Sequence, residues 1–390
     1  MSREKIGILA GSFDPIHKGH IAMARAAVET AGLDRVLFVP VDRRNGTDAV
    51  ADHVSRWQMT VAACTEDPRF QPADIAEDHD IAELPALAEG MFPKDEISFI
   101  IGADQFADEA WKKVSDETRG KLKLLVCPRP AADPLLCNTI RKQFEKAGSE
   151  VKMLRMVPVT VSSTQIRETL AEGKTTSQLH VAVREYIACK GLYGISQRIP
   201  EADIWIGRLF DSQKPSRFAH SLSVAYTSRR LARIHGIDSI RAEQAGLLHD
   251  CAKCIPLKQM QQIAKMYHLT DDPTINENAG LLHSYVGEYI AERDYGMKDP
   301  EVLQAIRYHN TGNAGMTILD ICVCLSDSIE PCRANYPGLE KIRVLSELSL
   351  ERALLLSLER TAEYVAETGK ALHPKTAETI TWLKSLQVNK

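Results

Sequence analysis

The chain has 390 residues, more than one hydrophobic core usually organises, because single cores stop growing at roughly 250–300 residues. A composition of 44% hydrophobic and 26% charged residues is ordinary for globular domains and excludes a disordered or collagen-like chain. The net charge of −4 argues against a nucleic-acid-binding surface, and no apolar run reaches the ~20 residues that cross a bilayer. Nine scattered cysteines are typical of the reducing cytosol, so we expect a cytoplasmic protein that binds neither nucleic acid nor membrane.

The first half of the chain alternates β-branched runs with helical patterns. The expected strands are residues 6–10, 36–39, 97–101, 122–126 and 151–157. The expected helices are residues 21–30, 55–66, 106–114 and 139–147. Such alternation is typical of a doubly wound parallel α/β sheet, and we expect residues 1–195 to form this domain.

Beyond a connector at residues 192–200, the strand signals disappear and apolar residues recur at helical spacing. The expected helices are residues 218–235, 240–249, 257–267, 284–294, 300–308, 318–329 and 350–367. We therefore expect residues 196–390 to form an all-α domain.

A candidate phosphate-binding turn follows the first expected strand, beginning at Gly11, Ser12 and Phe13 and containing His17 and His20. A glycine turn between a strand and a helix presents backbone N–H groups and the positive end of the helix dipole to an anion. Two imidazoles at the start of that helix can donate to phosphoryl oxygens and stabilise the charge of an in-line displacement. The alternative is a turn with two surface histidines, and the whole string in this context favours phosphate binding.

The string resembles the nucleotidyltransferase superfamily, which carries a histidine-x-glycine-histidine motif after its first strand. A second motif that resembles this superfamily is Ser-Ser-Thr-Gln-Ile-Arg at residues 162–167. Hydroxyls at this position cap a helix. The resemblance implies that Ser163, Thr164 and Arg167 hold the β- and γ-phosphates of a nucleoside triphosphate.

Within that superfamily, residues 5–195 are similar to the bacterial nicotinate-mononucleotide adenylyltransferases. Gly102 and Asp104 match the family's strand-ending motif, Trp111 matches its aromatic residue near the pyridine ring, and Arg129 follows the next strand. The resemblance implies a Rossmann-like fold and adenylyl transfer from ATP, with magnesium, to nicotinate mononucleotide in NAD biosynthesis.

The sequence departs from this family after the second strand, where the family usually carries a Pro-Pro-His-Lys loop. Here the chain has Asp42, Arg43 and Arg44. Either arginine can replace the lost cation, whereas Asp42 repels phosphate. Two alternatives therefore stay open: an acceptor like that of the phosphopantetheine adenylyltransferases, which normally have Thr in place of His17, or an inactive scaffold domain.

Histidines and aspartates recur in the second half in the order His, His-Asp, His, His, Asp. These candidate metal ligands are His220, His249, Asp250, His283, His309 and Asp327. The order resembles the two-metal HD phosphohydrolases, and the surrounding strings are similar to the YqeK family of symmetrical bis(5′-nucleosyl)-tetraphosphatases. Four imidazoles and two carboxylates suit iron, manganese or cobalt better than magnesium, and the resemblance favours iron.

The HD resemblance also implies how the ligands are shared and what they act on. It implies that Asp250 bridges two metal ions. His220, His249 and Asp327 would complete the ligands of one ion, and His283 and His309 would complete those of the other. The expected reaction is hydrolysis of diadenosine tetraphosphate to two ADP.

Three cationic residues are candidates for binding the substrate's phosphates. Lys253 lies three residues after Asp250, where it can neutralise a phosphate oxygen, and Arg307 and Arg333 are candidates for gripping ADP. The alternative is a sensor that binds a dinucleotide without turnover, and a homo-oligomer stays open. Cys251, Cys254, Cys322 and Cys324 also suggest a zinc site, although small buried hydrophobic residues are the simpler interpretation.

Overall fold

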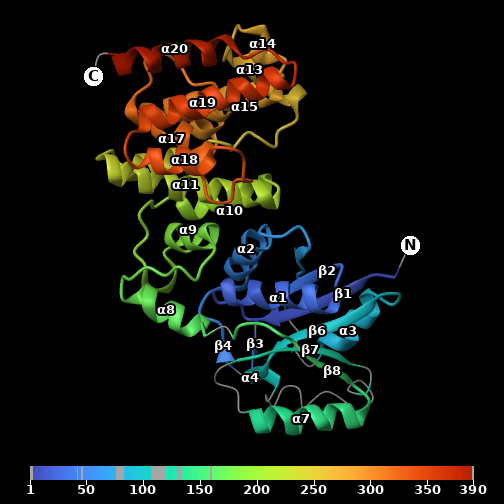
Figure 1. Ribbon diagram of the computed structural model, residues 1–390. Coiled ribbons are helices and arrows are strands. Elements are labelled where there is room, and N and C mark those ends of the chain that lie inside the picture. The colour runs from blue at the N-terminus through green and yellow to red at the C-terminus, as the bar shows by residue number, and fades with distance from the viewer. Residues whose placement is uncertain are drawn as a thin grey trace. The chain divides into compact units, whose positions relative to one another are not determined.

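The computed structural model describes residues 3–41, 43–44, 47–75, 83–106, 120, 122–129, 134–158 and 160–388 (Figure 1). The chain forms two compact units, Met1–Ser196 and Gln197–Lys390. Trp111, Asp42 and most of the helix expected at residues 106–114 lie outside the described residues, as do the side chains of Arg43 and Arg44.

The N-terminal unit is built on a six-stranded sheet in the order β5-β2-β1-β6-β7-β8, with every pair of neighbours parallel (Figure 1). The strands are β1 Lys5–Gly11, β2 Arg35–Pro40, β5 Phe70–Pro72, β6 Glu96–Gly102, β7 Lys123–Cys127 and β8 Glu150–Met153. The expected doubly wound parallel sheet is therefore confirmed. Strand β5 was not expected, because three residues are too few to show a pattern, and the exposed edge strand β8 ends before the expected residue 157.

Helices connect these strands, as parallel pairing requires. They are α1 Lys18–Ala31, α2 His53–Cys64, α3 Leu84–Met91, α4 Ala103–Phe106 and α7 Pro134–Ala147. Helices α8 Ser163–Ala171 and α9 Val181–Lys190 follow the last strand. A short antiparallel pair, β3 Arg43–Arg44 and β4 Thr47–Asp48, lies outside the main sheet. Helix α1 begins after its cap His17 and ends at Gly32, whose φ of 64° is a conformation that glycine adopts without steric cost.

The order of the strands locates a crevice in the N-terminal unit. Strand β1 pairs with β2 on one side and with β6 on the other, so the sheet grows in both directions from β1. In open parallel sheets, ligands bind beyond the carboxyl ends of the strands at such a switch point. Those ends are Gly11 of β1 and Gly102 of β6, and both belong to the motifs singled out from the sequence.

The C-terminal unit contains no strand among its described residues and consists of helices (Figure 1, yellow to red). They are α10 Ala202–Ser212, α11 Pro215–His235, α12 Ser239–Leu248, α13 Leu257–Tyr267, α14 Pro273–Asn276, α15 Ala279–Arg293, α16 Pro300–Tyr308, α17 Ile318–Ile329, α18 Leu339–Ser346, α19 Leu350–Glu367 and α20 Pro374–Val388. The expected all-α fold is confirmed. Nowhere in the described parts of the chain is a helix both long enough and apolar enough to cross a bilayer.

The core of the C-terminal unit is formed where α11 packs against α12 and α17, and where α16 packs against α12, α15 and α17. Gly246 permits the close approach of α12 to α11, because a Cβ there would lie 2.8 Å from Oγ of Ser228 and 3.0 Å from Cα of Ala225. This packing brings the C-terminal end of α12 next to the middle of α11. His249 directly follows α12, and His220 lies in the second turn of α11, where the centroids of the two rings are 5.2 Å apart.

Candidate functional sites

The turn between β1 and α1 fixes the orientation of both its histidines. Nδ1 of His17 accepts a hydrogen bond from the backbone N–H of Gly19 at 3.1 Å, and Nδ1 of His20 accepts from the N–H of His17 at 3.2 Å. The two rings stack with their centroids 3.8 Å apart. A neutral imidazole that accepts at Nδ1 carries its proton on Nε2. Both rings are therefore set to donate an N–H from Nε2.

His17 stays neutral at physiological pH. Burial, reinforced by the positive charge of Arg129, lowers the pKa of His17 to about 3. A neutral ring donates one hydrogen bond to a phosphoryl oxygen and needs no change of protonation state to do so.

Three residues that the sequence analysis did not single out hold this turn in place. The buried carboxylate of Asp14 accepts hydrogen bonds from the N–H groups of Val50 and Ala51 and from the hydroxyl of Tyr193 at 2.6 Å. The buried guanidinium of Arg56 donates to the carbonyl oxygens of Ser12 and Ala51. Asp14 lies within the turn, so its place in the sequence was the available signal. Arg56 and Tyr193 are distant in sequence, and nothing in their surroundings signals the contact.

The structure brings the start of α8 against the same turn. Ser162 caps α8, and the hydroxyl of Ser163 donates to the carbonyl of Pro15 at 3.0 Å. Arg167 donates to the carbonyl of Asp14 at 2.6 Å and to Oγ1 of Thr164 at 3.4 Å. The start of α8 therefore lies against the turn that carries the histidines, which is an arrangement suited to a polyphosphate.

The residues that follow β6 and β7 lie close together, beside α1. Arg129 contacts Sδ of Met23 on α1 at 3.5 Å, and its Nε lies 3.7 Å from the Asp104 carboxylate. A Cβ at position 102 would lie 2.4 Å from Oδ1 of Asp104 and 3.2 Å from Nε of Arg129. Gly102 is thus required for the close approach of these two side chains.

In the C-terminal unit, four histidines surround the buried carboxylate of Asp250. Its Oδ1 lies 3.0 Å from Nε2 of His283 and 3.7 Å from Nε2 of His309. Its Oδ2 lies 3.3 Å from Nε2 of His249 and 3.8 Å from Nε2 of His220. Each carboxylate oxygen therefore faces a different pair of imidazoles, as a carboxylate does when it bridges two cations.

Asp327 completes the cluster on one side. Its Oδ1 lies 2.9 Å from Nε2 of His220 and 3.9 Å from Nε2 of His249. All six predicted ligands thus come together, and they form three overlapping groups that could each hold a metal ion. The groups are His220, His249 and Asp250; His249, His309 and Asp327; and Asp250, His283 and His309.

Three of the imidazoles are anchored through Nδ1. His249 donates to the carbonyl of Gly246 and His309 to the carbonyl of Ile306, both at 2.7 Å. Nδ1 of His220 lies 3.0 Å from a carboxylate oxygen of the buried Glu330. A ring that donates from Nδ1 keeps its lone pair on Nε2, which is the state that binds a metal. Glu330 was not predicted as a site residue; its place three residues after Asp327 was the available signal.

The charges of the cluster suit a cation. Although burial alone would raise the pKa of Asp250, His249 and His283 hold it well below its usual range. Burial, with His249 and His283, lowers the pKa of His309 to about 3. Nε2 of His220, Nε2 of His249 and Oδ1 of Asp250 are buried and face one another across the cluster, but no contact between the described residues gives any of them a hydrogen bond of good geometry. Buried polar atoms of this kind are costly unless a ligand binds them, so the donor set fits metal ions.

Cations surround this acidic and imidazole cluster. Arg217 forms an ion pair with Asp250 at 2.5 Å, Lys253 lies 3.9 Å from the same carboxylate, and Arg333 lies 3.5 Å from Asp327. Burial lowers the pKa of Lys253, and the nearby carboxylates oppose that shift. Arg217 was not predicted as a site residue; its position one helical turn before His220 was the available signal.

The structure places Arg307 differently from Lys253 and Arg333. Its guanidinium forms an ion pair with Glu288 at 2.6 Å, donates to the carbonyl of Leu269 and lies over the ring of Tyr285 at 4.5 Å. These contacts describe a structural ion pair. The four cysteines considered for zinc belong to none of the candidate metal groups among the described residues, and three of them are buried.

The two units define a class of protein: a doubly wound α/β unit with a candidate phosphate site, followed by a helical unit with a candidate two-metal site. A family model described as Cytidylyltransferase-like matches residues 8–169, and the HD domain model matches residues 217–332. These matches cover the two sites described above.

Three relatives resemble the halves or the whole. The "Bis(5′-nucleosyl)-tetraphosphatase, symmetrical" of Bacillus subtilis is 39% identical over 173 residues, covering 43% of this chain and 90% of that protein. The "Probable nicotinate-nucleotide adenylyltransferase" of Thermus thermophilus is 37% identical over 194 residues, covering 48% of this chain and 99% of that protein. The "Probable nicotinate-nucleotide adenylyltransferase/Ap4A hydrolase" of Mycoplasma genitalium is 27% identical over 383 residues, covering 94% of this chain and 100% of that protein. The chain belongs to the nicotinate-nucleotide adenylyltransferase family in its N-terminal half and to the symmetrical bis(5′-nucleosyl)-tetraphosphatase family in its C-terminal half.

We expect His17 to make the N-terminal unit less stable in acid. Because its pKa is about 3 in the fold and 6.5 ordinarily, the unfolded chain takes up the proton first as the pH falls below 6.5. The free energy of unfolding should then fall by about 1.4 kcal/mol per pH unit from this group. His17→Asn keeps a capping side chain and should remove that part of the slope.

The measurement is urea unfolding from neutral pH down to about pH 4, read by pulse-labelled hydrogen exchange of β1. His268→Asn is the control, since His268 is exposed and its φ of 51° is tolerated by asparagine. Equal slopes for the wild type and His17→Asn would contradict a neutral buried His17.

Proposed function

We propose that the chain is a bifunctional enzyme. The N-terminal unit transfers the adenylyl group of ATP, bound with magnesium, to nicotinate mononucleotide, and the C-terminal unit hydrolyses diadenosine tetraphosphate to two ADP. The observation that carries the hydrolase is the cluster of four Nε2 atoms around both oxygens of Asp250. The names of the relatives support both substrates.

In the transferase, the phosphate oxygen of the acceptor attacks the α-phosphorus of ATP and pyrophosphate leaves. His17 and His20 donate from Nε2 to the phosphoryl oxygens, whose negative charge grows in the transition state. Arg167 and the start of α8 hold the departing phosphates. Gly102 and Asp104 lie at the end of β6, where the acceptor would bind.

In the hydrolase, the chemistry that two bound metal ions (iron, manganese or cobalt) would supply is a water nucleophile at neutral pH and polarisation of the phosphoryl group. His220, His249, Asp250, His283, His309 and Asp327 would hold them. Glu330 orients His220 through Nδ1, and Lys253, Arg217 and Arg333 bind the phosphate oxygens. A partly buried Lys253 interacts strongly with phosphate because little water screens it.

Asp250 and Lys253 should separate metal binding from rate. Asp250→Ala removes the carboxylate that both pairs of imidazoles face, so the protein should lose bound metal and hydrolysis together. Lys253→Ala should keep its metal and lose rate. Metal content by mass spectrometry, measured beside turnover, tests this. Full metal occupancy in Asp250→Ala would contradict the bridging role.

The two histidines of the turn should control the transferase. With ATP, magnesium and nicotinate mononucleotide, His20→Ala should slow pyrophosphate release by ~10²–10³, the usual scale for removing one transition-state donor. His235→Ala, outside the turn, is the control. If pyrophosphate forms with phosphopantetheine but not with the mononucleotide, the acceptor assignment is wrong. If no pyrophosphate forms with either acceptor, the N-terminal unit is an inactive scaffold.

Oxygen-18 water distinguishes the hydrolytic alternatives. Attack at the second phosphorus of diadenosine tetraphosphate should put label into ADP alone, because the two ADP halves are released by one cleavage. ATP and AMP as products would contradict symmetric cleavage. Tight binding without turnover in the presence of iron, manganese and cobalt would favour the sensor.

A further inference from the structure

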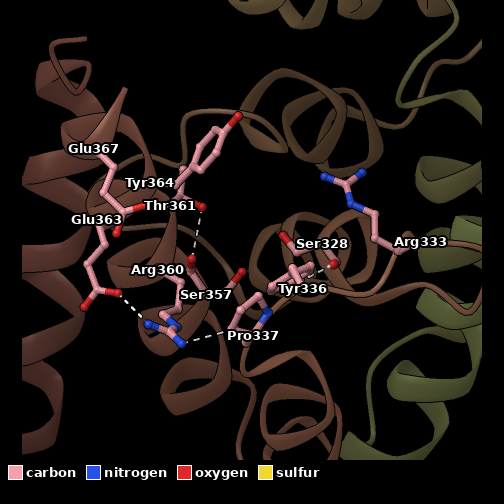
Figure 2. Close-up of a pocket in the computed structure, with 10 residues that line it drawn as sticks. All are labelled: Ser328, Arg333, Tyr336, Pro337, Ser357, Arg360, Thr361, Glu363, Tyr364 and Glu367. Carbon is pink, nitrogen blue, oxygen red and sulfur yellow. Dashed lines mark hydrogen bonds and ion pairs between the residues drawn. The ribbon is translucent and has the colours of Figure 1, made fainter. Parts of the chain in front are cut away.

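A cavity of about 470 Å³ lies in the C-terminal unit between the end of α17, the segment that follows it and α19 (Figure 2). Its volume lies within the ~300–1,000 Å³ typical of small-molecule sites. The buried Ser357 and the exposed Thr361 lie on its α19 side, and Tyr336 lies on the opposite wall. The cavity therefore has a polar floor and an aromatic side.

Arg333 connects the cavity with the candidate metal ligands. Ser328, which lines it, follows the candidate ligand Asp327 in sequence. Arg333 also lines it, and its Nη1 lies 3.5 Å from Oδ1 of Asp327. A molecule that fills the cavity can thus place an anionic end beside Arg333 and within reach of the cluster.

The charges along the cavity are asymmetric. Figure 2 shows Arg333 at one end and Glu363 and Glu367 toward the other, with the two tyrosines between them. Arg360 also lines the cavity and pairs with Glu363, so Glu367 is the carboxylate left to face a ligand at that end. A nucleoside phosphate has the same asymmetry, because its phosphates are anionic and its base carries N–H donors that a carboxylate accepts. The aromatic ring of Tyr364, 66% exposed, offers a surface for base stacking.

The walls are braced before any ligand binds. Arg360 forms an ion pair with Glu363 at 2.7 Å and donates to the carbonyl of Pro337 at 3.3 Å. The hydroxyl of Tyr336 donates to the carbonyl of Ser328 at 3.2 Å. These bonds connect the segment after α17 to α19 and to α17 itself. Binding of a ligand therefore loses little conformational entropy in the walls of the cavity.

We propose that this cavity binds one adenosine of the dinucleotide substrate, with Arg333 between its phosphates and Asp327. The assignment rests on the hydrolase function proposed above and adds the place of the nucleoside. Tyr364 stacks on the base, and the carboxylate of Glu367 accepts from its amino group. Binding of this remote part of the substrate positions the phosphorus for attack.

The test uses the full chain loaded with manganese. Thr361→Trp fills the cavity from an exposed position, and Ala366→Trp adds the same side chain to an exposed position of α19 that does not line it. For diadenosine tetraphosphate, Thr361→Trp should lower kcat/KM about tenfold or more, mainly through KM, as expected for a lost base-stacking site. Hydrolysis of bis(p-nitrophenyl) phosphate, which has no nucleoside, should stay unchanged in both variants.

A second pair of variants guards against misfolding. Tyr364→Ala removes an exposed ring and should raise KM, whereas Tyr364→Phe should restore it, because stacking needs the ring and not the hydroxyl. If the wild type cleaves the dinucleotide and Thr361→Trp matches Ala366→Trp, the cavity assignment is overturned while the hydrolase stands.

Binding of ADP to the manganese-loaded protein, measured by calorimetry, tests whether the cavity binds a nucleoside even if the wild type shows no turnover. In that case the proposed hydrolase function has failed. Weaker ADP binding in Thr361→Trp alone still supports the nucleoside site. Equal ADP binding in both tryptophan variants, or none in the wild type, overturns it.

Discussion

An imidazole has two nitrogens, and the partner of one decides what the other can do. Nδ1 of His17 and of His20 accepts a backbone N–H, so Nε2 carries the proton and can donate to phosphate. Nδ1 of His249 and of His309 donates to a backbone carbonyl, so Nε2 offers a lone pair to a cation. One residue type therefore has opposite chemistry in the two units, and both sites depend on this anchoring.

The polarity of the helices explains which backbone group each ring meets. His17 and His20 lie at the start of α1, where the first N–H groups have no partner within the helix. His249 and His309 lie at the ends of α12 and α16, where the last carbonyl groups have no partner within the helix. A histidine at a helix start thus becomes a donor, and one at a helix end becomes a ligand. The position of each residue along its helix connects the sequence to the chemistry.

The fold could be predicted from periodicity, because buried parallel strands and amphipathic helices leave strong patterns. The short β5 and the helices α3, α9, α10, α14, α18 and α20 were not among the predicted elements. The six histidines and aspartates of the cluster were found because their order resembles a known family. Arg56 and Tyr193 were not found, because their partners lie far away in sequence and only folding brings them together.

The anchoring also connects function with stability. A buried polar atom without a partner costs about 1–3 kcal/mol, and the cluster around Asp250 contains several such atoms. The surrounding helices hold these atoms in place through bonds to Gly246, Ile306 and Glu330 that do not involve a cation. A cation that satisfies the atoms binds a site already arranged for it, and its binding free energy adds to the stability of the C-terminal unit. Preorganisation of this kind weakens the apo fold and strengthens the metal-bound one, so the helices that shape the site and the ions that occupy it stabilise each other.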